Sequence, residues 1–222
     1  MKKYLPAIII SVVILAVIGF VVFALKSTDN KQSDLDKTSS KLISNDDKKL
    51  LTVGWSSGPE GAKTVLTEFG DFQCAACKKY EPILADLKKE FENKFKLIFK
   101  EFPLTNIHKN AELAALSAEA AGDQGKFWEM HGLLYVNQEK WAESNEAMNE
   151  FINFASQLGL DVTKFKNDVE SKKFIDKINQ DRSLGDRLAV PGTPTFYING
   201  EVVDTTTGSD ALRQAIKNAV EK

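Results

Sequence analysis

The sequence has few of the residues that metal sites and disulfide frameworks require. Its 222 residues include only 2 cysteines and 2 histidines. A structural zinc site needs about four such ligands, and His108 and His131 lack the spacing of a zinc finger. The modest content of glycine and proline, 13 and 6 residues, and the 27% of charged residues exclude collagen, a coiled coil and a wholly disordered chain. We therefore expect an ordinary globular protein without a metal site.

The chain also lacks a strong excess of charge of either sign. Its 29 basic and 31 acidic residues give a formal net charge of -2. A nucleic-acid-binding domain carries a basic surface, and the sequence has no helix-turn-helix or zinc-finger pattern to compensate for the missing charge. No nucleic acid partner is therefore expected, and the mild acidity favours solubility without indicating a particular partner.

Long apolar runs are absent except for one near the start of the chain. Residues 5–25 contain no charged side chain, and Lys2 and Lys3 precede them. About 20 apolar residues span a bilayer as a helix, and flanking lysines stay on the cytoplasmic side. We predict a transmembrane anchor over residues 1–25 in the cell membrane, with the rest of the chain on the extracytoplasmic side. The alternative is a signal peptide cleaved near Ala24, which exports the same residues.

The remainder divides into a polar segment and one folded domain. Residues 26–49 contain no aromatic side chain and are rich in Lys, Asp, Ser, Asn and Thr. Such a stretch cannot bury enough apolar surface to fold, so we predict a flexible tether. Dense apolar periodicity begins at Leu50 and continues to the C-terminus, which predicts a folded domain over residues 50–222.

Within this domain, hydrophobic periodicity and turn signals predict an α/β fold. Asn199-Gly200 suits a tight hairpin turn, and Ser209 suits the start of the last helix. In chain order we expect a strand at 65–69, a helix at 74–92, a strand at 96–102, helices at 111–121, 127–136 and 146–158 with shorter ones up to 188, hairpin strands at 195–198 and 201–203, and a helix at 209–220. This order is typical of a sheet interrupted by a helical insertion, here about residues 105–188.

The two cysteines form a Cys-Ala-Ala-Cys motif where the first strand passes into a helix. Residues three apart in the first helical turn lie on one face, so Cys74 and Cys77 are close enough to form a disulfide. The helix N-terminus presents free N–H groups to Cys74 and lowers the pKa of a thiol there. Because a thiolate is the species that attacks another disulfide, the motif favours thiol–disulfide exchange.

Three other roles for this pair stay open at this point. A metal site lacks further ligands, and covalent haem requires a histidine where Lys78 stands. A purely structural disulfide is the third, although closing so short a loop stabilises little. A second feature lies before the hairpin, where Thr193-Pro194 is a candidate cis peptide bond at the start of a strand.

At this point the chain resembles the DsbA-like thiol–disulfide oxidoreductases of the thioredoxin fold. The resemblance rests on four segments, which are Glu68–Cys77, Phe102–Leu104, Ala118–Glu129 and Gly192–Phe196. It implies a thioredoxin sheet with a helical insertion, Cys74 as the exposed nucleophile and Cys77 as the resolving thiol. It also implies that Thr193 and Pro194 form the cis-proline loop beside the disulfide, where the substrate backbone docks.

The resemblance also bears on residues around the motif. Glu68 resembles the family's buried carboxylate, which accepts a proton from Cys77, and an ordinary strand-edge acid is the alternative. Ala75 and Ala76 stand where family members often carry Pro-His or Pro-Tyr, and alanine offers the thiolate no side-chain donor. We expect His108 to be a loop or cap residue and His131 a packed helix residue, with no catalytic role for either.

The predicted function is that of a membrane-anchored, extracytoplasmic protein thiol–disulfide oxidoreductase that introduces disulfides into exported proteins. No cofactor is expected, because the pair Cys74 and Cys77 is itself the redox group. The resemblance implies exported polypeptides with thiols or disulfides as substrates and a membrane redox partner that restores the disulfide. The alternatives are a reductase or isomerase of the same fold and a non-catalytic, tethered peptide-binding module.

Overall fold

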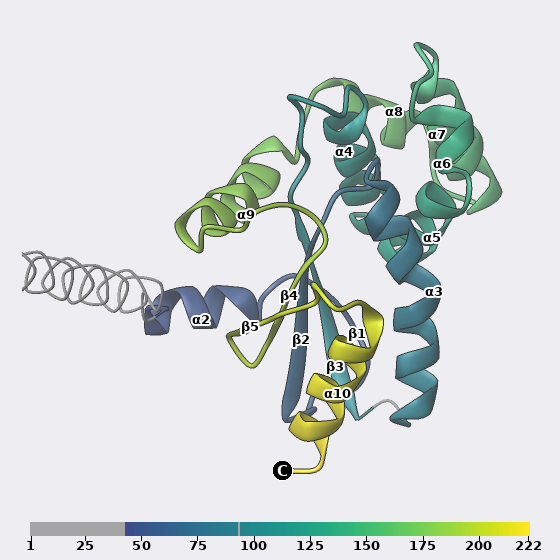
Figure 1. Ribbon diagram of the computed structural model, residues 1–222. Coiled ribbons are helices and arrows are strands. Elements are labelled where there is room, and N and C mark those ends of the chain that lie inside the picture. The colour runs from purple at the N-terminus through teal and green to yellow at the C-terminus, as the bar shows by residue number, and fades with distance from the viewer. Residues whose placement is uncertain (1–42, 93) are drawn as a thin grey trace, which may run out of the picture. The chain divides into compact units, whose positions relative to one another are not determined.

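The computed structural model describes residues 43–92 and 94–222 (Figure 1). The anchor predicted over residues 1–25 and most of the tether predicted over 26–49 lie outside this part of the chain. Among the described residues, no helix is both long and apolar enough to cross a bilayer.

A five-stranded sheet forms the centre of the described domain, with the strand order β1-β3-β2-β4-β5. Its strands are β1 (Trp55–Ser57), β2 (Thr64–Gly70), β3 (Phe95–Glu101), β4 (Thr195–Ile198) and β5 (Glu201–Val203). β2 and β3 are parallel and are connected by helix α3 (Ala75–Glu90), whereas β1, β4 and β5 run antiparallel to their neighbours. β2 is therefore a central strand, and its C-terminal end leads directly to the cysteines.

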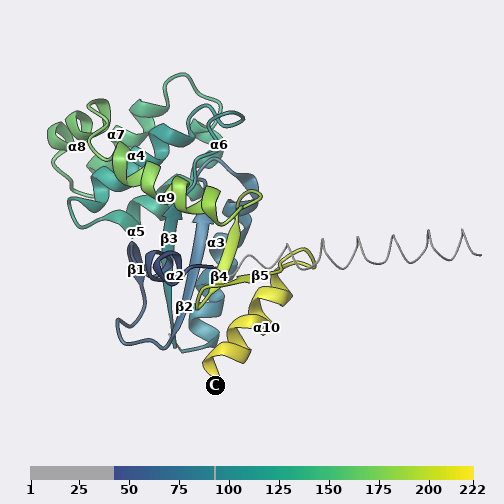
Figure 2. The same ribbon diagram turned by 90° about the vertical axis from the view of Figure 1, so that its left-hand side faces the viewer.

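Side chains of β2 alternate between two apolar cores, as expected for a strand covered on both faces. Leu66 faces a core shared with α3 and α10 (Ser209–Val220), whereas Phe69 faces a core shared with α2 (Asn45–Leu51) and α9 (Ile175–Arg187). Figure 2 shows α2 and α9 in front of the sheet. The sheet thus lies between two pairs of helices.

The helical insertion forms a third core at the end of the sheet that carries the cysteines (Figure 1). It contains α4 (Ala111–Gly122), α5 (Phe127–Val136), α6 (Gln138–Trp141), α7 (Ala147–Gln157) and α8 (Val162–Glu170), and it leads into α9. Nearly all of α4 is buried and most of its buried residues are alanines, and the large side chains of Trp141, Phe151 and Phe165 belong to the same core. The prediction of an α/β sheet interrupted by a helical insertion is confirmed.

Three elements were not predicted, and each is short. β1 has 3 residues and α6 has 4, too few to show a period in the sequence. The helix α2 corrects the predicted end of the tether at residue 49, because residues 45–51 are helical. The Ser44 side chain accepts a hydrogen bond from the Asp47 backbone N–H at 3.0 Å and begins this helix, and Leu51 anchors it in the core.

Candidate active site

The two cysteines open helix α3 at the C-terminal end of β2. Cys74 is the N-cap residue, and its backbone N–H donates to the Asp71 carbonyl at 3.0 Å. Cys77 lies inside the first turn and is 1% exposed, whereas Cys74 is 9% exposed. Cys74 is thus the outer thiol of the pair, although it is less exposed than the resemblance implies. The exposed residues Ala75 and Ala76 lie between the two cysteines.

The loop before β4 reaches the outer thiol. The Cys74 Sγ lies 3.2 Å from the backbone oxygen of Thr193. The Thr193-Pro194 peptide bond is cis, as predicted from the sequence. Two segments more than a hundred residues apart in sequence therefore meet at one sulfur atom.

The surroundings of the two thiols favour opposite protonation states. A hydrogen bond from the Cys77 side chain is the largest cause that lowers the pKa of Cys74, to about 5. Burial opposes this shift, while hydrogen bonds from the backbone N–H groups of Cys77 and Ala76 add to it. Burial is also the main reason why the pKa of Cys77 lies well above its ordinary value. Near neutral pH, Cys74 is a thiolate and Cys77 a thiol.

Glu68 lies in the sheet close to the pair. It is 2% exposed on the central strand β2, so the alternative of an ordinary strand-edge acid does not hold. Burial is the largest cause that raises its pKa to about 8, and the charges of Glu81 and Cys74 raise it further. A carboxyl group with this pKa can hold or release a proton near neutral pH, which is what a proton acceptor for Cys77 requires.

Sequence reasoning missed the residues that hold the active-site turn in place. The Gln138 amide, on α6, donates to the backbone oxygens of Phe72 at 2.7 Å and Cys74 at 3.2 Å. The Gln73 amide donates to the Ala142 oxygen at 2.8 Å and accepts from the Asn110 backbone N–H at 2.8 Å. These contacts join segments far apart in sequence, so no local sequence pattern predicts them.

The comparisons with known proteins agree with this geometry. Residues 52–218 match the family model described as Thioredoxin. The chain is 30% identical over 222 residues to the probable disulfide bond formation protein D of Bacillus anthracis, covering 97% of this chain and 95% of that protein.

The chain belongs to the thioredoxin family. This confirms the fold that the resemblance implied, and the relatives place the chain with the DsbA-like oxidoreductases of that family. The structure of BdbD from Bacillus subtilis is similar, with a TM-score of 0.68 at 22% identity over 75% of this chain and 92% of that one.

Another match extends over only part of the relative. The chain is 36% identical over 162 residues, or 73% of its length, to the Na(+)/H(+) antiporter NhaA 1 of Salinispora arenicola. These residues correspond to 24% of that protein. The chain therefore spans about a quarter of the length of such relatives.

The low pKa of Cys74 predicts a distinctive reaction profile with iodoacetamide. At pH 6 Cys74 is largely ionised, whereas an ordinary cysteine is about 0.3% ionised. A low-pKa thiolate is also a weaker nucleophile, so we expect reaction roughly fivefold to tenfold faster than that of an unstructured thiol peptide at pH 6. At pH 8.5 the order reverses, and Cys74 reacts roughly tenfold to thirtyfold more slowly.

Peptide mapping after brief labelling of the reduced protein measures both rates at the level of single residues. The unstructured thiol peptide, labelled in the same tube, is the control for reagent concentration. Labelling of Cys77 before Cys74 would reverse the roles assigned to the two thiols.

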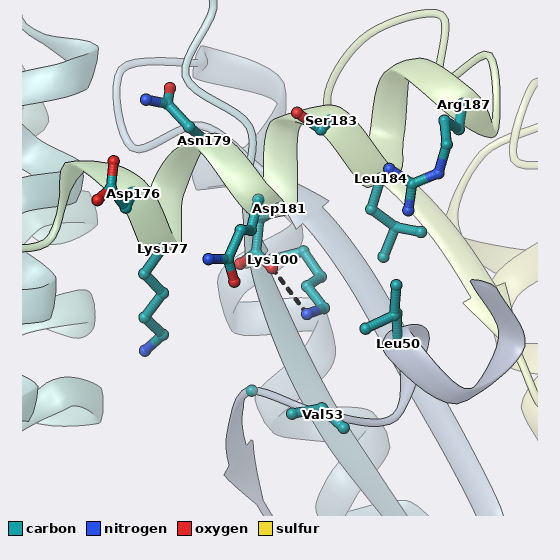
Figure 3. Close-up of a pocket in the computed structure, with 12 residues that line it drawn as sticks. Leu50, Val53, Lys100, Asp176, Lys177, Asn179, Asp181, Ser183, Leu184 and Arg187 are labelled. Atoms are coloured by element: carbon teal, nitrogen blue, oxygen red, sulfur yellow. Dashed lines mark hydrogen bonds and ion pairs between the residues drawn. The ribbon is translucent and has the colours of Figure 1, made fainter. Parts of the chain in front are cut away.

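A separate pocket of about 580 Å³ lies between α9 and the segment around α2 (Figure 3). None of the residues described above at the cysteines lines it. Figure 3 shows the Lys100 ammonium group directed at the Asp181 carboxylate, and the two groups are 2.7 Å apart. Their side chains are 6% and 11% exposed, so this is a buried ion pair between β3 and α9.

The buried pair has a direct consequence for the stability of this thioredoxin-family domain. Replacing Lys100 by methionine leaves the Asp181 carboxylate without its ammonium partner, and we expect the free energy of unfolding to fall by roughly 3–5 kcal/mol. The double variant Lys100→Met, Asp181→Leu removes both charges and should recover most of that loss. Urea unfolding checks both, and equal losses in the two variants would contradict this account.

Proposed function

We propose that the chain is an extracytoplasmic protein thiol–disulfide oxidoreductase that introduces disulfides into exported polypeptides. One observation carries this proposal, namely the contrast between the low pKa of Cys74 and the high pKa of its neighbour Cys77 at a helix N-terminus. A stable thiolate favours the reduced form of the pair, so the oxidised form readily takes electrons from substrate thiols. The name of the Bacillus anthracis relative supports the same direction.

The reaction proceeds in two exchange steps. A substrate thiolate attacks the Cys74 sulfur of the oxidised pair, which breaks the Cys74–Cys77 bond and forms a mixed disulfide. Cys77 leaves as a thiolate, and its high pKa draws a proton that Glu68 can supply. A second substrate thiolate then attacks the substrate sulfur and releases Cys74 as a thiolate. The substrate loses two electrons and gains a disulfide, and the pair is reduced.

The loop before β4 provides the docking position in this scheme. Because the Thr193 backbone oxygen lies 3.2 Å from the Cys74 sulfur, an extended substrate bound along this loop brings its own sulfur to Cys74. Thr193 and Pro194 thus act on the substrate backbone, which suits an enzyme that accepts many polypeptides. The scheme uses no cofactor besides the cysteine pair.

The membrane setting belongs to the same proposal. Lys2, Lys3 and the uncharged run of residues 5–25 support an anchor with the domain outside the cytoplasm. A membrane redox partner with its own cysteines would restore the disulfide after each turnover. The full-length chain should then fractionate with membranes and resist carbonate extraction, whereas a soluble mature protein beginning near Leu25 would indicate cleavage.

The equilibrium reduction potential against glutathione tests the proposed direction. A value near about -120 mV is expected of an oxidase, and a value near about -270 mV would instead establish the reductase or isomerase alternative. Insulin turnover by the Cys74→Ala variant tests the non-catalytic module. Unchanged turnover in that variant would show that the cysteines do not carry the activity.

A further inference from the structure

Asp71 lies between β2 and the cysteines, and its contacts stabilise the turn that places Cys74 at the start of α3. One oxygen of its carboxylate, Oδ1, accepts from the Gln73 backbone N–H at 2.7 Å. Its backbone oxygen accepts from the Cys74 N–H at 3.0 Å and from the Tyr135 hydroxyl at 3.3 Å. The Asp71 side chain is 0% exposed, so every contact it makes is within the protein.

The other carboxylate oxygen, Oδ2, reaches a different loop. It accepts from the Leu104 backbone N–H at 2.8 Å and lies 2.7 Å from the Nδ1 atom of His108. An ionised carboxylate only accepts hydrogen bonds, so Nδ1 is the donor in this contact. The His108 side chain is 21% exposed and is the outer member of the pair.

The carboxylate is therefore a buried charge with three donors around it, and His108 is the only side chain among the three donors that these contacts identify. Removing one donor from a buried charged group costs free energy of folding, because water cannot replace the lost hydrogen bond. Other titratable groups are close enough to sense this charge. Burial first, with the Asp71 charge among the lesser causes, raises the pKa of Tyr135 and of Glu101 well above their ordinary values.

We propose that Asp71 and His108 are a positioning pair that fixes the active-site turn and thereby sets the reactivity of Cys74. The Nδ1–H group of His108 donates to the Asp71 carboxylate, and the carboxylate accepts from the Gln73 N–H. The Asp71 backbone oxygen in turn accepts from the Cys74 N–H. Neither side chain touches the reacting sulfur in this arrangement. The pair acts by keeping Cys74 at the start of α3, where the Cys77 side chain can donate to its thiolate. This inference rests on the proposed role of Cys74 as the nucleophile.

Two amide variants of His108 separate positioning from general stability. The side-chain amide of asparagine places a donor near the position of Nδ1, whereas that of glutamine places it near Nε2. We expect His108→Asn to keep the rate of Cys74 alkylation at pH 6 within about twofold of the wild-type rate. We expect His108→Gln and His108→Ala to lower that rate at least fivefold. The Asp71 carboxylate then lacks one of its donors, the turn is no longer fixed, and Cys74 loses the hydrogen bonds that stabilise its thiolate.

The measurement is residue-specific alkylation at pH 6, with the thiolate absorbance followed from pH 3 to 9 and the thermal midpoint recorded for each variant. Asn106→Ala, at an exposed position of the same loop, is the matched control and should match the wild type. Lower thermal midpoints with unchanged rates and titration curves in both His108→Gln and His108→Ala would make the pair merely structural and overturn the proposal. If wild-type labelling occurs at Cys77 instead, the proposed function fails separately.

Discussion

Replacing Cys74 by serine will lower disulfide exchange at pH 7 at least about a hundredfold, because the remaining thiol is protonated and buried. Burial raises the pKa of Cys77 well above its ordinary value, so this thiol is almost entirely protonated at that pH. Only 1% of its surface is exposed, which also restricts access by a polypeptide. Reduction of insulin disulfides and oxidation of a reduced, unfolded substrate both measure this loss.

The matched variant Cys77→Ser is expected to behave differently. It keeps the Cys74 thiolate, which can still attack a disulfide, but it lacks the thiol that resolves the mixed disulfide. Enzyme and substrate should therefore accumulate as a covalent complex on a non-reducing gel, and reductant should release it. A complex that accumulates with Cys74→Ser and not with Cys77→Ser would exchange the two roles.

Glu68→Gln will stabilise the reduced protein in alkaline solution and leave its stability near pH 4 unchanged. The pKa of Glu68 is about 8 in the folded protein, mainly because of burial, and near 4.5 when unfolded. Because the pKa is higher in the folded protein, the unfolded chain releases this proton at a lower pH than the folded protein does. The wild type therefore loses stability as the pH rises from 4.5 to 8. The difference at pH 8 is roughly 4 kcal/mol in favour of the glutamine variant.

Denaturant unfolding of the reduced wild type and variant, repeated at several pH values, measures this difference. Glu60 is exposed, so Glu60→Gln is a matched control with an expected effect below about 0.5 kcal/mol at every pH. A constant gap between wild type and Glu68→Gln from pH 4 to 8 would show that the carboxyl does not titrate in this range.

Much of the fold was predictable because its main elements bury long periodic faces. The predicted strand at 65–69 and helix at 127–136 agree with β2 and α5 to within a residue. Burial on both faces of β2 and around α5 forces apolar residues into regular positions, and the sequence displays them. β1 and α6 have too few residues to do so. α2 lies largely in a polar run, and Ile43 just before it and Leu51 at its end are the apolar residues of this run that contact the core.

The active site, like the fold, was predictable from the sequence only in part. Cys74, Cys77 and Pro194 stand out because they are rare residue types at turns, where each of them suits only a few roles. Gln138 and His108 do not stand out, because a glutamine or a histidine outside a motif occurs in many settings. Their roles depend on backbone groups of Phe72 and Cys74 and on the Asp71 carboxylate, which only the folded chain brings near. Long-range hydrogen bonds of this kind leave no local pattern.

The pairing of β2 with β4 has a consequence for how this thioredoxin-family domain folds. Leu66 pairs with Ile198, so these two central strands meet only when a loop that contains the entire helical insertion closes. Closing a loop of this length costs roughly 4 kcal/mol of chain entropy, and such distant pairings slow folding. The Thr193 contact with Cys74 depends on that closure. A partly folded chain therefore carries both cysteines before Thr193 has reached the Cys74 sulfur.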